Sequence, residues 1–281
     1  MSGTLYLVPT PIGNLGDISS RMAETLASVD FIAAEDTRVT LKLLNHLGLK
    51  KPLVSYYRHN TGESGAAVLA RLLEGEDCAL VTDAGTPAIS DPGEDLVRQC
   101  ARGGISVVSI PGPCALITAL AASGLPTGRF TFEGFLPMNR KNRRAHLKAL
   151  QGETRTMLFY EAPHKLAATL NDLRDTFGED RQIALCRELT KLHEEIRRTT
   201  LGEAAAWYSQ NPPKGEFVLV VQGGEPIREE GASLDQGLAR MDVLRGEGLS
   251  LRDAARQAAR ELGLPRNSLY QKALAGADSK S

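Results

Sequence analysis

Short apolar runs alternate with amphipathic segments along the first 110 residues of the chain. Runs at 4–8, 31–34, 53–56, 79–81 and 107–110 are typical of buried strands. Between them, residues 18–29, 40–49, 64–74 and 93–101 have apolar side chains at helical spacing, and we expect Ala67, Leu69, Leu72 and Leu73 to face the core. Strands that alternate with helices predict a parallel α/β sheet with right-handed crossovers.

The alternation continues in the second half of the chain. An apolar helix at 114–124 is expected to lead into a second α/β domain, with strands at 130–137, 156–160, 182–186 and 216–221 and a helix at 165–177. After a polar linker at 225–233, a helix ending at Gly263 and a second helix at 268–275 resemble a helix-turn-helix. We therefore expect an N-terminal α/β domain at 1–115, a C-terminal α/β domain at 116–224, and a linker with a small helical domain at 225–281.

Three turns at strand ends are the strongest candidates for a binding site. Residues 80–93 read LVTDAGTPAISDPG, residues 111–115 read PGPCA, and a stiff turn with two prolines spans 9–17. Small residues at the carboxyl end of a strand let a ligand approach the backbone and its N–H donors. The turns at 83–87 and 111–115 are expected on neighbouring strands, where they would frame one crevice. The first turn matches neither the dinucleotide fingerprint nor the P-loop.

Charged residues cluster at three places. Residues 35–38 (EDTR) follow a strand, so they either mark the edge of a site or form a solvated loop. Residues 139–148 carry six cationic side chains at a loop-to-helix junction, where the helix dipole disfavours them, which favours contact with a phosphate backbone over a solvated helix start. The C-terminal helical pair exposes Arg266, Asn267, Gln271 and Lys272, and it either contacts nucleic acid or serves in packing or dimerisation.

Composition narrows the class of protein. The chain has 281 residues and a formal net charge of −1, which argues against non-specific coating of nucleic acid. We see neither a signal peptide nor a membrane span, and the four cysteines form no C-x-x-C motif. A soluble cytoplasmic protein with reduced thiols and no bound metal is expected.

Seven motifs resemble one known family. In order between residues 4 and 222, VPTPIGNLGDIS, AAEDTR, VTDAGTPAISDPG, IPGPCALITAL, FEGFLP, FYEAPHKL and GEFVLVVQG are similar to the tetrapyrrole-methylase superfamily of S-adenosylmethionine-dependent methyltransferases. Within it they resemble the ribosomal RNA small-subunit methyltransferase I group, whose extra domain the helical pair also resembles. The first loop is not Gly-rich as in tetrapyrrole-modifying members, and the superfamily's Gly-Asp-Pro turn appears here as Gly85-Thr86-Pro87.

The resemblance implies methyl transfer to the ribose 2′-hydroxyl of a cytidine in the decoding region of 16S ribosomal RNA. It also implies a homodimer that acts on this RNA or on the small ribosomal subunit, and a cofactor, S-adenosylmethionine, that lies between the two α/β domains. Cys114 would then line the cofactor site and would not act as a nucleophile. The cofactor-binding residues carried over by motif are Pro11, Ile12, Asp83, Gly85, Thr86, Ile89, Cys114, Ala115, Tyr160, Leu189 and Phe217.

The chemistry suggests further roles, because a weakly acidic ribose hydroxyl benefits from a general base or a nearby cation. Asp36 or Glu35 is the candidate base, and Arg38 or Lys191 the candidate cation. The candidate RNA-binding residues are Arg140, Lys141, Arg143, Arg144, Lys148, Arg266 and Lys272. Three alternatives remain open: a corrinoid or porphyrin methylase of the same fold, a protein methylase similar to diphthine synthase, and a non-catalytic RNA- or nucleotide-binding module.

Overall fold

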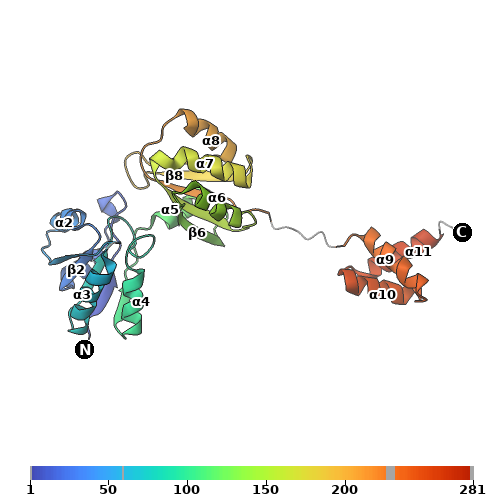
Figure 1. Cartoon of the computed structure of the whole chain (residues 1–281), viewed down its shortest axis with the longest axis horizontal. Helices are drawn as coiled ribbons and strands as arrows, with labels where there is room; N and C mark the ends of the chain where they lie inside the picture. The colour runs from blue at the N-terminus through green and yellow to red at the C-terminus, as the bar shows by residue number, and fades with distance from the viewer. Residues whose placement is uncertain (1, 59, 226–231, 279–281) are drawn as a thin grey trace. The chain divides into compact units, whose positions relative to one another are not determined.

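The computed structural model describes residues 2–58, 60–225 and 232–278 (Figure 1). The chain divides into two compact units, Met1–Gly224 and Glu225–Ser281. Most of the linker expected at 225–233 lies outside the described residues. The first unit contains two sheets covered by helices and the second contains helices, which confirms the predicted fold class. The expected boundary between residues 115 and 116 stays a prediction.

The first sheet is fully parallel, as predicted, with the order β3-β2-β4-β1-β5. Each strand agrees with the predicted one to within one residue at either end. The apolar runs were readable because the central strands are buried on both faces, which leaves no polar alternation to obscure them. The strands are β1 (Thr4–Leu7), β2 (Phe31–Ala34), β3 (Leu53–Ser55), β4 (Cys78–Val81) and β5 (Ser106–Ser109).

Helices cover both faces of this sheet. The α1 (Ser20–Ser28) and α2 (Thr37–His46) helices pack on one face, and α3 (Thr61–Leu73) and α4 (Glu94–Arg102) pack on the other. A short 3-10 turn, Leu15–Asp17, precedes α1.

Two details of these helices differ from the sequence prediction. The α2 helix starts three residues earlier than expected, because the Asp36 carboxylate accepts the Arg38 N–H and caps it. In α3 the buried stripe runs through Gly65, Val68 and Leu72, whereas Leu73 is 58% exposed and Ala67 also faces solvent. Gly65 was missed as a core position because it has no side chain, and Tyr56 packs against it.

The second sheet is mixed, with the order β6-β7-β10-β8-β9, and only β6 and β7 pair in parallel. The edge strand β9 and the helix α8 that follows it were not predicted. The β9 sequence EIRRTT is mostly polar and gives no apolar run. The strands are β6 (Phe130–Phe135), β7 (Thr156–Glu161), β8 (Gln182–Arg187), β9 (Glu195–Thr200) and β10 (Phe217–Val221). The helices are α5 (Ala115–Ser123), α6 (Arg140–Ala149), α7 (Pro163–Phe177) and α8 (Leu201–Gln210).

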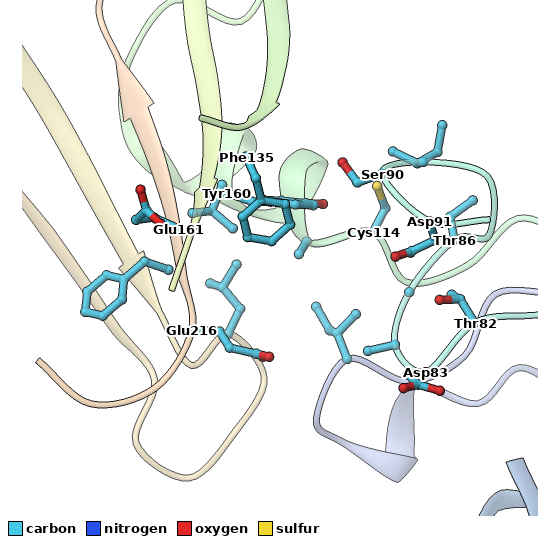
Figure 2. Close-up of a pocket in the computed structure, with 18 of the residues that line it drawn as sticks. Thr82, Asp83, Thr86, Ser90, Asp91, Cys114, Phe135, Tyr160, Glu161 and Glu216 are labelled. Atoms are coloured by element: carbon cyan, nitrogen blue, oxygen red, sulfur yellow. The ribbon is translucent and has the colours of Figure 1, made fainter. Parts of the chain in front are cut away.

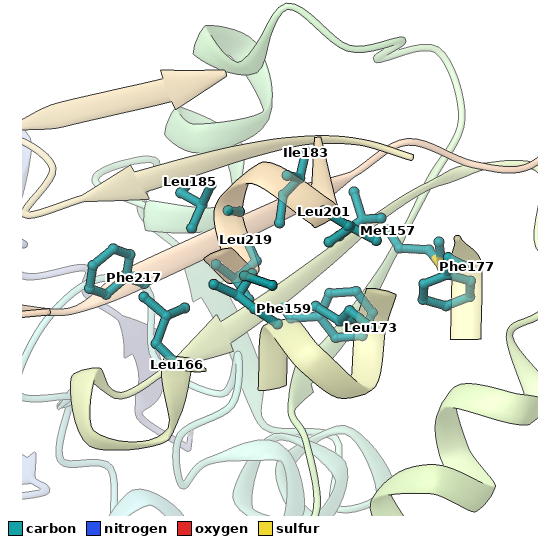
Figure 3. Close-up of a cluster of buried hydrophobic side chains, with 14 of the residues drawn as sticks. Met157, Phe159, Leu166, Leu173, Phe177, Ile183, Leu185, Leu201, Phe217 and Leu219 are labelled. Carbon is teal, nitrogen blue, oxygen red and sulfur yellow. The ribbon is translucent and has the colours of Figure 1, made fainter. Parts of the chain in front are cut away.

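The core of this sheet has two layers, and β10 contributes to both. Phe217 and Leu219 point into the layer closed by α6, α7 and α8 (Figure 3), whereas Val218 and Val220 pack against α5. Alternate residues of a strand point to opposite faces, so a central strand must be apolar throughout. The sheet is therefore a rigid support for the strand ends that carry the site.

Residues 232–278, the part of the second unit that the structure describes, form a bundle of three helices and not the expected pair. The additional helix is α9 (Leu234–Gly246), which starts at a capping box formed by Ser233 and Gln236. It is followed by α10 (Leu251–Leu262), which is capped by Ser250 and ends, as predicted, at Gly263, and by α11 (Arg266–Asp278). Met241, Leu244 and the small residues of α10 form its own core.

Candidate functional site

The three turns at the carboxyl edge of the first sheet are bonded to one another. Thr10 and Gly85 exchange two backbone hydrogen bonds of 2.9 and 3.0 Å, and Thr10 Oγ1 donates to the Thr82 carbonyl at 3.0 Å. Thr86 Oγ1 donates to the Pro113 carbonyl at 2.9 Å. The expectation that two turns follow neighbouring strands is wrong, because β1 lies between β4 and β5. The turns meet nevertheless, because the loop after β1 and the turn after β5 are both hydrogen-bonded to the central turn.

The central turn has an unusual backbone. Gly85 has a φ of +88°, which a glycine adopts freely, but Ala88 and Ser90 also lie in the left-handed region at +66° and +67°. Such conformations cost energy in residues with a β-carbon and cluster at functional sites. Residues 83–86 and 89–91 of this turn line the cavity described next.

A cavity of about 350 Å³ lies between the two sheets of the first unit (Figure 2). One wall is formed by the turns after β1, β4 and β5, and the other by the ends of β6, β7, β8 and β10. Ten of the eleven expected cofactor-binding residues line it: Ile12, Asp83, Gly85, Thr86, Ile89, Cys114, Ala115, Tyr160, Leu189 and Phe217. Pro11 is the exception.

The wall that belongs to the first sheet is acidic. The Glu35 carboxylate accepts a hydrogen bond of 2.6 Å from Thr82 Oγ1 and a longer one of 3.4 Å from the Asp83 N–H. Burial and the charge of Glu35 raise the pKa of Asp83. For the same two reasons, the pKa of Asp91 rises to about 6, although Thr82 and Arg58 oppose the shift. Crowded carboxylates of this kind would be relieved by a cationic ligand.

The opposite wall presents a fixed cation. Lys191 Nζ donates to Glu188 Oε1 at 3.0 Å and to Glu216 Oε2 at 3.2 Å. Burial lowers the pKa of Lys191, but the hydrogen bonds and charges of the two carboxylates outweigh burial and raise it. The side chain is therefore an ammonium group at neutral pH, suited to stabilise negative charge and unsuited to accept a proton.

The backbone around Lys191 is shaped to hold it there. Glu188 and Thr190 have left-handed φ values of +50° and +65°. Gly215 also has a positive φ, of +83°, and a β-carbon at this position would collide with Glu188. A β-carbon on Gly13 would collide with the Lys191 side chain, so the loop after β1 packs directly on this lysine. Both sheets therefore determine the position of Lys191.

Of the four candidate catalytic residues, Glu35 and Lys191 line the cavity, whereas Asp36 and Arg38 do not. Asp36 binds Arg38 through its Nε at 3.0 Å and its Nη2 at 2.6 Å, in addition to capping α2. The hydrogen bonds from Arg38 hold the pKa of Asp36 at about 2, so it is a poor proton acceptor. We therefore withdraw Asp36 as the base and Arg38 as the cation.

Among the lining residues that were not predicted as site residues are Asp91, Phe135, Glu188 and Glu216. Asp91 lies in the Ser-Asp-Pro-Gly turn, whose sequence signalled a break but not a site. The other three come from strand ends of the second sheet. Phe135 and Glu216 lie in the motifs FEGFLP and GEFVLVVQG, but only the pairing of β6, β7, β8 and β10 brings the three residues to one wall of the cavity.

The arginine and lysine residues of α6 fall into two groups, those that bind Asp172 and those that are exposed without an ion pair among the described residues. Arg143 binds Asp172 of α7 through its Nε at 2.8 Å and its Nη2 at 2.7 Å, and Arg144 Nε lies 3.4 Å from the same carboxylate. Asp172 is only 5% exposed, so this pair fastens α6 to α7 and Arg143 is no free phosphate contact. Arg140, Lys141 and Lys148 are exposed on α6.

The second unit carries the other two candidate RNA contacts, Arg266 and Lys272. Lys272 Nζ is 2.8 Å from Asp235 Oδ1, in an exposed ion pair between α11 and α9, and Arg266 is exposed at the start of α11 without an ion pair among the described residues. Within the part of the chain that the structure describes, no group of His, Cys, Asp or Glu side chains is arranged to hold a metal ion. Among the described helices, none is both long and apolar enough to cross a membrane.

Comparison with known proteins gives two matches to protein families. Residues 4–205 match the Tetrapyrrole (Corrin/Porphyrin) Methylases, and residues 231–277 match the RsmI C-terminal HTH domain. The chain is 49% identical over 272 residues to the ribosomal RNA small subunit methyltransferase I of Synechocystis sp., covering 97% of this chain and 98% of the relative. It is also 49% identical to the protein of the same name from Escherichia coli O157:H7, over 97% of this chain and 95% of that one.

Solved structures agree on the fold of the first unit. A cobalt precorrin-4 methyltransferase superimposes with a TM-score of 0.57 at 18% identity, over 77% of this chain and 94% of that one. Diphthine synthase superimposes with a TM-score of 0.58 at 14% identity, over 78% of this chain and 90% of that one. At such identities the likeness supports the fold only.

Proposed function

The chain belongs to the ribosomal RNA small subunit methyltransferase I family of the tetrapyrrole methylases, and from this premise we propose that it methylates the ribose 2′-hydroxyl of a cytidine in the decoding region of 16S ribosomal RNA. It is an S-adenosylmethionine-dependent methyltransferase. The observation that carries the proposal is the cavity with its acidic wall on one side and Lys191 on the other.

The residues of the acidic wall fit S-adenosylmethionine. This cofactor carries a positively charged sulfonium and an ammonium group, and Asp83 and Asp91 have raised pKa values that a cation would bring down. Gly85 has no side chain, and a β-carbon there would press on Ile12 at 3.3 Å. We assign the turn at 83–91, with Cys114, Ala115, Tyr160, Leu189 and Phe217, to hold the cofactor.

The chain's own residues would position the ribose and stabilise its charge. When bound, S-adenosylmethionine supplies a methyl group on a leaving group that needs no protonation. Lys191 faces the same cavity and would hold the 2′-oxygen as it gains negative charge. Glu35 remains the proposed base, because it lines the cavity and its described hydrogen bonds engage Oε2 alone.

The surface residues suggest how the RNA is held. We assign Arg140, Lys141 and Lys148 of α6 and Arg266 of α11 to phosphate contacts, since all four are exposed and none of them appears in an ion pair of the described structure. Few contacts and a net charge of −1 suit a substrate recognised by shape as well as by charge. A cytoplasmic homodimer that acts on the RNA or on the small subunit completes the proposal; sedimentation of the purified protein tests the dimer.

The direct test uses tritiated S-adenosylmethionine with small ribosomal subunits from cells that lack the modification, and free 16S RNA in parallel. We expect label in the RNA at one cytidine, in a linkage that resists alkaline hydrolysis. Label on the base, or label at another nucleotide, would contradict the 2′-O assignment. Tight cofactor binding without any RNA label would favour a small-molecule substrate instead.

A further inference from the structure

Phe135 is an exposed aromatic residue at the cavity. It is the last residue of β6, it is 56% exposed, and it lines the cavity (Figure 2). The two other aromatic side chains of the lining differ from it. Phe217 is 2% exposed and belongs to the core, and Tyr160 is half-buried. An apolar ring of this size that stays in solvent inside a concave site is expected to have a ligand.

A bulge in β6 gives Phe135 its direction. The pairing of β6 with β7 shifts register between Phe132 and Gly134, so one extra residue is inserted into the strand. In a regular strand, residues three apart point to opposite faces. Because of the bulge, Phe132 and Phe135 lie on the same side, and both contact Tyr160, with ring centroids 4.9 and 5.5 Å away. Bulges that redirect a side chain are common beside active sites.

The neighbouring residues fix this arrangement. Gly134 has a φ of +64°, and a β-carbon there would lie 3.5 Å from Ser90 Oγ of the central turn. The rings of Phe135 and Tyr160 meet edge to face, at 63°. Phe135 therefore packs on the Tyr160 ring of the neighbouring strand β7, while more than half of its surface stays free.

We propose that Phe135 stacks on the base of the nucleotide that is methylated. The inference rests on the proposed function, because methyl transfer inside the cavity requires the target nucleotide to leave its helical stack. An unstacked base loses its neighbours, and an aromatic side chain replaces them without regard to sequence. The cationic groups of the cofactor are attracted to the acidic wall, so the exposed ring of Phe135 is left for the RNA.

The test compares Phe135→Ala, Phe135→Leu and Phe135→Trp with the unaltered protein. Methylation of small subunits is measured as kcat/KM, and binding of S-adenosylmethionine is measured separately by calorimetry. Loss of a base–aromatic stack corresponds to a loss in kcat/KM of roughly 5- to 150-fold. We expect that loss for the Ala and Leu variants, near-complete retention for Trp, and cofactor affinity within about twofold in all three.

Three results would overturn the inference. If cofactor affinity falls as much as kcat/KM, Phe135 stacks on the adenine of the cofactor. If Leu restores full activity, the residue only fills space. If Ala retains full activity, the ring has no role. In each case the unaltered protein still labels the RNA, so these failures are distinct from a failure of the proposed function, in which it would not.

Discussion

The ion pair between Arg143 and Asp172 predicts a large and specific loss of stability. Asp172 is 5% exposed and Arg143 13%, and the pair joins α6 to α7. In Asp172→Asn the guanidinium keeps its charge but loses its carboxylate in a place that water reaches poorly. Breaking a buried pair in this way costs about 3–5 kcal/mol, and we expect about 3 because Arg143 retains some contact with water.

The matched control removes both charges. Replacing a buried pair by apolar residues of similar volume is often neutral, so Arg143→Met with Asp172→Leu is expected within about 1 kcal/mol of the unaltered protein. For a unit of this size, each kcal/mol shifts the melting temperature by roughly 2–4 °C. Asp172→Asn should therefore melt about 6–12 °C lower, whereas the double variant should melt within about 4 °C.

The assay is urea and thermal unfolding followed by fluorescence. Trp207 is the single tryptophan of the chain, and it lies on α8, which packs beside α7. It therefore reports on the sheet that the ion pair supports. If the double variant is as unstable as Asp172→Asn, the pair itself is stabilising and our reasoning on unpaired charge is wrong.

The same residues separate a structural role from an RNA contact. Each phosphate contact contributes about 0.7–0.9 to the slope of log affinity against log salt. Lys141→Gln should lower that slope by about this amount, whereas Arg143→Met in the double variant should leave it unchanged. If the slope falls equally in both variants, Arg143 does contact an RNA phosphate.

Three further predictions concern the cavity. Lys191→Met should lower the single-turnover rate of methylation by about 10²- to 10³-fold with cofactor affinity retained, and an unchanged rate would remove Lys191 from the mechanism. Affinity for S-adenosylmethionine should weaken as the pH falls through about 6, because Asp91 gains a proton and loses the charge that attracts the cofactor. Calorimetry between pH 5 and 8 should find this dependence flattened in Asp91→Asn, and an equal dependence in the variant and the unaltered protein would contradict the role of Asp91. Gly215→Ala should destabilise the protein by about 1–2 kcal/mol through its left-handed φ and should lower activity further by displacing Glu188, so a variant with normal stability and activity would contradict the role of this turn.

The first sheet was predictable because its strands are apolar on both faces and its helices are amphipathic. The second sheet was predictable only in part. Its strands β7, β8 and β10 are apolar runs, but β9 lies at an edge with Ile196 as its single apolar residue, and α8 follows it without a break in the sequence. The α9 helix was missed because its start is marked by a capping box and not by a strong apolar stripe.

The site was predictable to the extent that strand ends determine it. The rule that ligands bind at the carboxyl ends of parallel strands selected the turns that line one wall. It gave no information on Glu188, Glu216 or Phe135, because their strands are antiparallel neighbours or carry a bulge. The same rule placed Asp36 and Asp83 at one edge of the sheet. It did not indicate that the Asp36 carboxylate would accept the Arg38 N–H and cap α2.

The two walls of the cavity are built by different means, and this difference bears on their roles. The first-sheet wall is made of turns that contain left-handed residues, and the pKa values of its carboxylates Asp83 and Asp91 are raised. A cationic ligand of fixed shape would therefore be bound favourably there. The second-sheet wall presents Phe135 and Lys191, two long side chains held by neighbours but open on one side. A rigid backbone suits a cofactor that is the same in every cycle, and oriented side chains suit a nucleotide that must enter from a large RNA. Because the loop around Gly13 packs on Lys191, a shift in the first wall would move the cation of the second, so binding of the cofactor and alignment of the ribose are expected to be coupled.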